Sequence, residues 1–139
     1  MAVEELADTI AGFALFADLS TPQREQVVDI FGEQWFGDGE KVMRQGLTGT
    51  ALYIVLDGQA AIRIDGVDRA TLRAGDYFGE ISTLLGEPPT ADIVAKGALR
   101  CLVLPSAQVE SFLKSNPTVM FRLLQGEARK VRTTTKWLS

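Results

Sequence analysis

The sequence predicts a mainly β (α+β) fold, an antiparallel sandwich, jelly roll or barrel, with helices at both ends of the chain. Three observations support this prediction. Short apolar runs separated by glycine and aspartate fill residues 35–104, which is typical of short strands joined by turns. Helical periodicity dominates before and after this part. Residues 77–86 interrupt the β pattern, because they show no period of two.

Two helices are expected in residues 1–34. The apolar positions of the first recur at helical spacing: Val3, Leu6, Ala7, Ile10 and Ala14. Ser20 and Gln23 form a capping-box pattern at the start of the second, and Pro22 falls in a first turn, where proline is tolerated. Gly32 is the residue at which this second helix is expected to stop.

The middle of the chain is expected to contain short strands. The candidates are residues 41–44, 52–56, 60–64, 70–72, 93–95 and 99–104. Asp57-Gly58 and Asp65-Gly66 predict tight turns between them. Because Ala60, Ile62 and Ile64 alternate with polar residues or smaller ones, the strand they form is expected to be half-buried.

A short helix is expected inside this β part. It opens near Glu80 and ends at Gly86, and Pro88-Pro89 prevent it from continuing. Its first backbone N–H groups would converge on one place, an arrangement with which proteins hold anions. Gly79 would let the backbone approach a ligand closely. The alternative interpretation is that Gly79 serves a tight turn and Glu80 caps the helix as an exposed acid.

Two more helices are expected in residues 105–139. Ser106 is expected to cap the first, and Asn116-Pro117 match the cap and first turn of the second. The apolar stripe of the last helix consists of Met120, Leu123, Leu124, Ala128 and Val131. This stripe either packs onto the chain's own β part or pairs with a second copy. Threonines at 133–135 predict a frayed end.

Composition narrows the function classes. With 139 residues, 46% of them hydrophobic, the chain can bury the core of one domain. Histidine is absent, which excludes Ser-His-Asp and Cys-His catalysis and argues against most zinc and non-haem iron sites. We therefore expect a protein that is not an enzyme. The single Cys101 favours a reducing, cytoplasmic setting, and no apolar run reaches the roughly 18 residues that span a membrane.

Charge is distributed unevenly along the chain. Residues 1–99 carry 7 basic and 16 acidic side chains, whereas residues 100–139 carry 7 basic and 2 acidic ones. Basic side chains late in a terminal helix complement its dipole, and docking onto an acidic partner or onto the chain's own acidic part is the alternative. Because the domain as a whole is not basic, direct nucleic-acid binding is not expected.

Four stretches in a fixed order carry a family resemblance. They are Phe16 with Leu19-Ser20, then Gly39-Glu40-Lys41-Val42 with Gln45-Gly46, then Leu52-Tyr53-Ile54-Val55 with Gly58, and Gly75-Asp76-Tyr77-Phe78-Gly79-Glu80-Ile81. With these residues the chain resembles the cyclic-nucleotide-binding domain shared by bacterial catabolite-activator-type regulators, kinase regulatory subunits and gated channels.

The resemblance implies one domain over residues 1–139, with an antiparallel β-roll (a double-stranded β-helix jelly roll) at 35–104 between the helical parts. It implies a phosphate-binding cassette at 75–92 and cyclic AMP or cyclic GMP as the ligand, with no metal and no other cofactor. In the family's pattern Glu80 accepts a hydrogen bond from the ribose 2′-hydroxyl, Thr90 lies near the phosphate or base, and Trp137 is a candidate aromatic lid. The implied ligand-binding residues are Phe78, Gly79, Glu80, Ile81, Ser82, Pro89, Thr90 and Ala91.

One position departs from the family's cassette. The arginine that pairs with the cyclic phosphate is replaced by Pro89, and no arginine or lysine occurs between Asp76 and Ala95. Losing one partner of a buried charge pair costs about 2–5 kcal/mol, roughly 30-fold to several thousand-fold in affinity. The basic residues considered as replacements are Arg44, Arg63, Arg73 and Lys96.

Three functions stay open at this point. The leading hypothesis is a cyclic-nucleotide sensor, a regulatory module in signal transduction whose last helix changes its packing when ligand binds. The second is a degenerate β-roll that has lost the nucleotide because of Pro89 and acts as a protein-interaction scaffold. The third, a cupin-like enzyme, lacks the histidines it needs. Expected partners are the nucleotide and either a second copy, bound through the last helix, or an unidentified protein; no membrane is expected.

Overall fold

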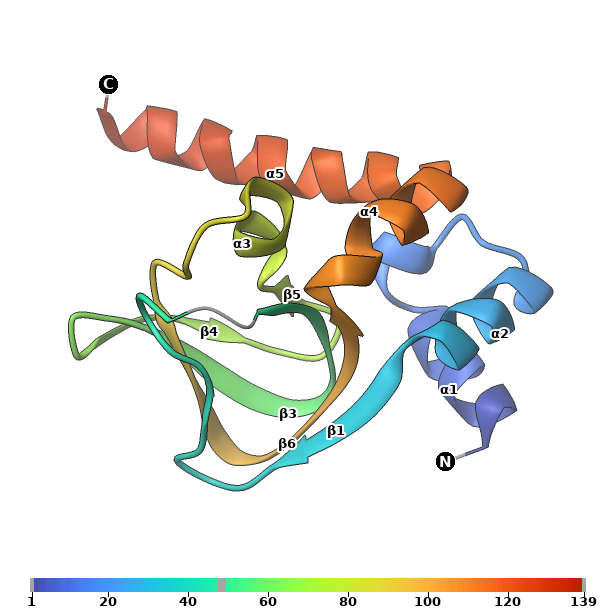
Figure 1. Cartoon of the computed structure of the whole chain (residues 1–139), viewed down its shortest axis with the longest axis horizontal. Helices are drawn as coiled ribbons and strands as arrows, with labels where there is room; N and C mark the ends of the chain where they lie inside the picture. Colours follow the sequence, from blue (N-terminus) through green and yellow to red (C-terminus); the bar gives the residue numbers. More distant parts are fainter. Residues whose placement is uncertain (1, 48–49, 139) are drawn as a thin grey trace.

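The computed structural model describes residues 2–47 and 50–138, and side chains up to residue 134. Helices lie at both ends of the chain around a β-roll (Figure 1). The elements are α1 (Val3–Ile10), η1 (Ala14–Phe16), α2 (Thr21–Ile30), β1 (Gly32–Phe36), β2 (Lys41–Met43), β3 (Ala51–Ile64), β4 (Val67–Leu72), β5 (Tyr77–Phe78), α3 (Glu80–Leu85), β6 (Asp92–Pro105), α4 (Ser106–Ser115) and α5 (Pro117–Leu138).

The N-terminal helices form where the sequence predicted them. Ser20 caps α2, and both hydrogen bonds of the capping box with Gln23 are present. The helix stops earlier than expected, however. Phe31 leaves the helical conformation, and its side chain is buried in the core. Strand β1 therefore begins at Gly32, ahead of the change expected at residue 35.

Within the described residues, six strands form one antiparallel sheet built on two long strands, β3 and β6. The sequence predicted two short strands in place of each. The turn expected at Asp57-Gly58 is wrong, because β3 runs through it and its pairing with β6 shifts register there, as at a β-bulge. The turn at Asp65-Gly66 is confirmed: both residues have positive φ, as a two-residue hairpin turn between β3 and β4 requires.

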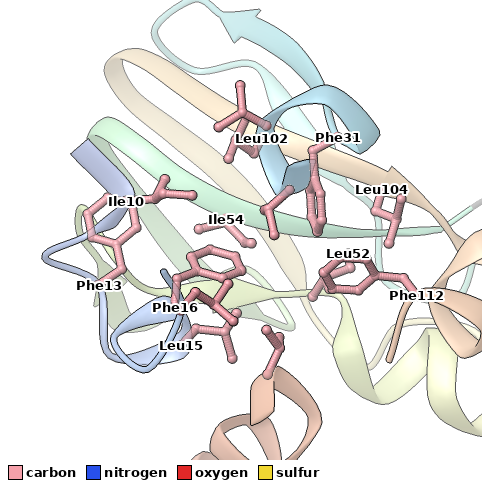
Figure 2. Close-up of a cluster of buried hydrophobic side chains, with 14 of the residues drawn as sticks. Ile10, Phe13, Leu15, Phe16, Phe31, Leu52, Ile54, Leu102, Leu104 and Phe112 are labelled. Carbon is pink, nitrogen blue, oxygen red and sulfur yellow. The ribbon is translucent and has the colours of Figure 1, made fainter. Parts of the chain in front are cut away.

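The first part of β3, residues 51–56, is buried on both faces, and each face belongs to a different hydrophobic cluster. Leu52, Ile54 and Leu56 point toward the helices, where they meet Phe16 and other residues of the first cluster (Figure 2). Ala51, Tyr53 and Val55 point into the roll and belong to the second cluster. The period of two in a strand places neighbours on opposite faces, so the unbroken apolar run 51–56 follows from two-sided burial.

The C-terminal helices cover one side of the roll. Helix α4 begins one residue earlier than a Ser106 cap would give, because Pro105 holds the capping position and Ser106 is the first helical residue. The Asn116 side chain donates to the carbonyl of Phe112, so it closes α4 as well as preceding α5. The threonine run does not end α5, because the hydroxyls of Thr133 and Thr134 donate to carbonyls four residues earlier.

Helix α5 presents a different stripe to the core from the one expected. Among its described side chains, Val119 and Leu123 are buried, whereas Met120, Leu124 and Val131 are exposed. Figure 1 shows why the burial changes along the helix: its first part lies beside α4, and its second part extends across α3. In the described part of the chain, no helix has both the length and the apolar character needed to cross a membrane.

Candidate functional site

A pocket of about 530 Å³ lies between the roll, α3 and the second part of α5. Its wall includes the segments 70–72, 75–82 and 89–91, with side chains of α5 on the remaining side. The sequence-predicted site residues all line it: Phe78, Gly79, Glu80, Ile81, Ser82, Pro89, Thr90 and Ala91. Met43, Ile62, Leu72 and Ile93 add apolar wall from the strands. The volume lies within the range of small-molecule sites.

Gly79 fixes the path of the chain along the pocket. Strand β5 pairs with β3 through Phe78 and Tyr53, so the residue that follows runs close to the start of β3. Gly79 caps α3 with φ +84°, and a Cβ there would overlap the carbonyl oxygen of Ala51. Only glycine meets both conditions, the left-handed conformation and the close approach to a neighbouring strand.

Phe78 belongs to the roll interior and to the pocket wall. Its ring stacks on Tyr53 with 4.8 Å between centroids and an interplanar angle of 3°. Both rings belong to the second hydrophobic cluster. The stacked rings hold the backbone directly before Gly79 in place, which fixes the position of the cassette.

Glu80 is buried at the pocket wall, with 4% of its surface exposed. The interpretation of this residue as an exposed capping acid is therefore wrong. Its Oε1 accepts a hydrogen bond from Lys130 Nζ of α5 at 2.9 Å. Lys130 also pairs with Glu127 at 3.1 Å and lies 4.8 Å from the centre of the Tyr77 ring. One ammonium group thus connects α5 to the cassette through an ion pair and a cation–π contact.

The ionisation of Glu80 carries a stability cost. Burial raises the pKa of Glu80 above its usual value, and the hydrogen bond from Lys130 opposes this shift without cancelling it. A carboxyl whose pKa is higher in the folded state favours folding when protonated, and this contribution is lost as pH rises through the folded pKa. Stability is therefore highest, as far as Glu80 is concerned, below about pH 4.5, its ordinary pKa.

We expect Glu80→Gln to be at least as stable as the parent at pH 7, because the amide avoids burying a charge and still accepts from Lys130. The difference in free energy of unfolding should shrink toward zero at pH 4. Urea denaturation at both pH values measures it, with Glu87→Gln, an exposed neighbour, as the matched control. A variant that is less stable by the same amount at both pH values would show that burial of the charge is not the dominant effect.

The basic residues at the pocket differ from those the sequence analysis considered. Arg63 and Lys96 pair with Asp68 at 2.7 and 3.3 Å. Arg44 lines a separate pocket of about 140 Å³, and Arg73 is absent from the described lining of the larger pocket. Among the described residues, the basic side chains that line it come from α5: Arg122, Arg129 and Lys130.

The spacing within α5 is the signal that would have located these residues. Arg122, Gly126, Arg129 and Lys130 fall at i, i+4, i+7 and i+8, so they share one face of the helix. The glycine marks the packed side of that face. A Cβ at Gly126 would overlap the hydroxyl of Tyr77, which donates to the carbonyl of Leu123 at 3.4 Å. The Trp137 side chain, the candidate lid, lies outside the described residues.

Thiol chemistry and metal binding are the next functions to compare with the described residues. Cys101 is buried in the roll, and burial raises the pKa of its thiol to about 12, so it stays protonated. No group of three or more metal-ligating side chains occurs in the part of the chain that the structure describes. Pro89 is buried, and its carbonyl accepts the N–H of Gly46 at 2.9 Å, which fixes the end of the cassette against the loop after β2.

Comparison with known proteins agrees with this geometry. The family model described as "Cyclic nucleotide-binding domain" matches residues 25–116, more than half of the chain. A cGMP-dependent protein kinase of Plasmodium berghei (strain Anka) is 32% identical over 119 residues, which are 86% of this chain and 14% of the kinase.

Two solved structures are similar over nearly the whole chain. The regulatory domain of Toxoplasma gondii PKA, crystallised with cAMP, is 25% identical with a TM-score of 0.77 over 92% of this chain and 50% of that one. The catabolite activator protein of Thermus thermophilus is 28% identical with a TM-score of 0.82 over 90% of this chain and 61% of that one. The chain thus spans only part of each of these relatives. It belongs to the cyclic nucleotide-binding domain family and has that family's β-roll fold.

Proposed function

We propose that the pocket binds a cyclic nucleotide and that the chain is a regulatory module without catalysis of its own, folded as a single domain over residues 1–139. Glu80 carries the proposal, because a carboxylate that is 4% exposed on a pocket wall is costly, and Lys130 engages only its Oε1. A ribose 2′-hydroxyl would be a further donor for this carboxylate. In support, one relative is a cGMP-dependent kinase and another was crystallised with cAMP.

The ribose, the phosphate and the base of the ligand can each be matched to residues of the pocket. The ribose lies against Glu80, and the cyclic phosphate lies near Ser82 and Thr90, whose hydroxyls can donate. The base lies along the apolar wall. Residues of α5 line the pocket, so the packing of this helix would respond to occupancy. A reducing, cytoplasmic setting accords with the single buried Cys101.

A second candidate function is a nucleotide-free scaffold. Two observations favour it: Pro89 stands where the family's arginine would be, and Lys130 already satisfies the carboxylate of Glu80. A scaffold needs a surface for a partner, whether a second copy or another protein. Helix α5 offers an exposed apolar stripe for this role, made of Met120, Phe121, Leu124 and Val131.

Titration with cyclic AMP and cyclic GMP distinguishes the two functions. We expect calorimetric binding to at least one of them, and a rise in melting temperature that grows with ligand up to millimolar concentration. At 100 times Kd, mass action stabilises the folded state by about 2.7 kcal/mol. The control is Glu80→Ala, which should bind more weakly. A flat response to both nucleotides from folded protein would reject the sensor and favour the scaffold.

A further inference from the structure

Helix α5 holds cations over a pocket whose cassette has none. We propose that α5 supplies the positive charge for the ligand's phosphate, with Arg129 as the phosphate-binding residue and Lys130 neutralising Glu80 beside it. The inference rests on the proposed function. It assigns to the C-terminal helix the role that the cassette arginine would otherwise have.

The three cations that line the pocket are engaged differently. Arg122 makes two hydrogen bonds to Asp18, at 2.7 and 2.9 Å, which pin the first part of α5 to the segment after η1. Lys130 is engaged by Glu80 and Glu127. Within the described part of the chain, the guanidinium of Arg129 has no hydrogen-bond or ion-pair partner. Of these three described cations, Arg129 is therefore the one that is available to a ligand.

The carboxylates that line the pocket already have hydrogen-bond donors, which leaves Arg129 for a ligand's phosphate. These carboxylates are those of Asp76 and Glu80. Asp76 accepts the backbone N–H of Arg73, and Glu80 is compensated by Lys130. A ligand that carries one negative charge therefore adds the partner that Arg129 lacks. Arginine suits this role, because its planar fork matches two phosphate oxygens.

The contacts that α5 makes with the rest of the domain fix the backbone position of Arg129. Val119 and Leu123 are buried in the main core, and Arg122 is fixed by Asp18, so the axis of the helix is set before it reaches the pocket. Beyond that point, Gly126 packs on Tyr77 and Lys130 contacts both the Tyr77 ring and Glu80. Arg129 lies between these two contacts along the chain. A phosphate bound by Arg129 would therefore hold α5 down over the pocket.

The test compares charged and uncharged ligands. We expect Arg129→Gln to weaken the binding of the preferred cyclic nucleotide roughly tenfold, as loss of one charge-assisted hydrogen bond implies. The same variant should bind the corresponding nucleoside, which has no phosphate, as the parent does. Arg132→Gln is the matched control, since it removes the same charge from the same helix at an exposed residue outside the described pocket lining. Calorimetry at fixed ionic strength measures all three proteins.

The outcomes separate this inference from the proposed function. If the parent binds cyclic nucleotide and Arg129→Gln binds it equally well, α5 does not carry the phosphate, and the proposed function stands. If Arg129→Gln weakens the binding of nucleoside and nucleotide alike, Arg129 supports the position of α5 and does not bind the phosphate. This result also overturns the inference. If the parent binds no cyclic nucleotide, both proposals are wrong.

Discussion

Replacing Gly79 with alanine is expected to lower the free energy of unfolding by about 2–5 kcal/mol. Two costs combine. The φ of +84° is a left-handed conformation, which costs an L-residue about 1–2 kcal/mol. The added methyl group would overlap the carbonyl oxygen of Ala51, and overpacking of this kind costs about 1–3 kcal/mol. Because that oxygen belongs to the backbone of β3, the neighbour cannot rotate away, so β5 and α3 must shift together.

Comparison with Gly39→Ala isolates the cost of the steric overlap. Gly39 has nearly the same φ, +81°, but no atom lies within 4 Å of the position of its Cβ. We expect Gly39→Ala to lose about 1–2 kcal/mol, clearly less than Gly79→Ala. Chemical denaturation of both variants gives the comparison, with equal m-values as the sign that the denatured states match. Equal losses at the two sites would show that the contact with Ala51 is relaxed at no cost.

Gly79→Ala should also affect ligand binding more than stability alone explains. The shift of β5 and α3 displaces Glu80, and with it the carboxylate that pairs with Lys130. Binding measured well below the melting temperature, where the variant is folded, reports this displacement. Gly39→Ala serves again as the control, because its turn lies outside the described lining of the pocket.

Local signals were sufficient where short-range contacts decide the structure. The capping box of Ser20 and Gln23, the hairpin turn at Asp65-Gly66 and the helix 80–85 with its end at Gly86 are all set by neighbours in sequence, and they were predicted. Asp57-Gly58 carries the same kind of signal but does not form a turn. Its flanking residues pair with β6, some forty residues away, and this pairing overrides the local preference.

The candidate site also has one part that local sequence signals located and one part that they did not. The cassette is nearly contiguous in sequence, from Phe78 to Ala91, so a pattern within one segment located the residues that now line one pocket. The cations of α5 come from a distant segment. Which side of that helix faces the pocket depends on the burial of Val119 and Leu123, whereas the predicted stripe omitted Val119 and included Met120 and Leu124. An amphipathic pattern with apolar residues on two faces does not specify which of them is buried.

Pro89→Arg is expected to strengthen cyclic-nucleotide binding about tenfold or more. Pro89 is buried on the pocket wall, so an arginine there would place a guanidinium where the family's pattern has its phosphate partner. A desolvated charge pair contributes about 2–5 kcal/mol, and each 1.4 kcal/mol is a factor of ten in affinity. The backbone tolerates the change, since the carbonyl at this position keeps its hydrogen bond from Gly46.

The unliganded variant should be less stable than the parent. Without a phosphate, the new guanidinium is a partly desolvated cation, and it must compete with Lys130 for Glu80 or reach toward water. Ligand should therefore raise the melting temperature of Pro89→Arg more than that of the parent. Two controls separate the causes: Pro89→Gln removes the proline without adding charge, and Pro88→Arg adds the charge at an exposed neighbour. Neither should gain affinity.

The same substitution in the Arg129→Gln background tests whether the two positions serve one function. If both guanidiniums bind the same phosphate, their effects are not additive, and Pro89→Arg should gain more affinity when Arg129 is absent than when it is present. Equal gains in the two backgrounds would mean that Arg129 and residue 89 act on different parts of the ligand. No gain in either background would mean that residue 89 does not face the phosphate, and the assignment of Pro89 to the position of the family's arginine would be wrong.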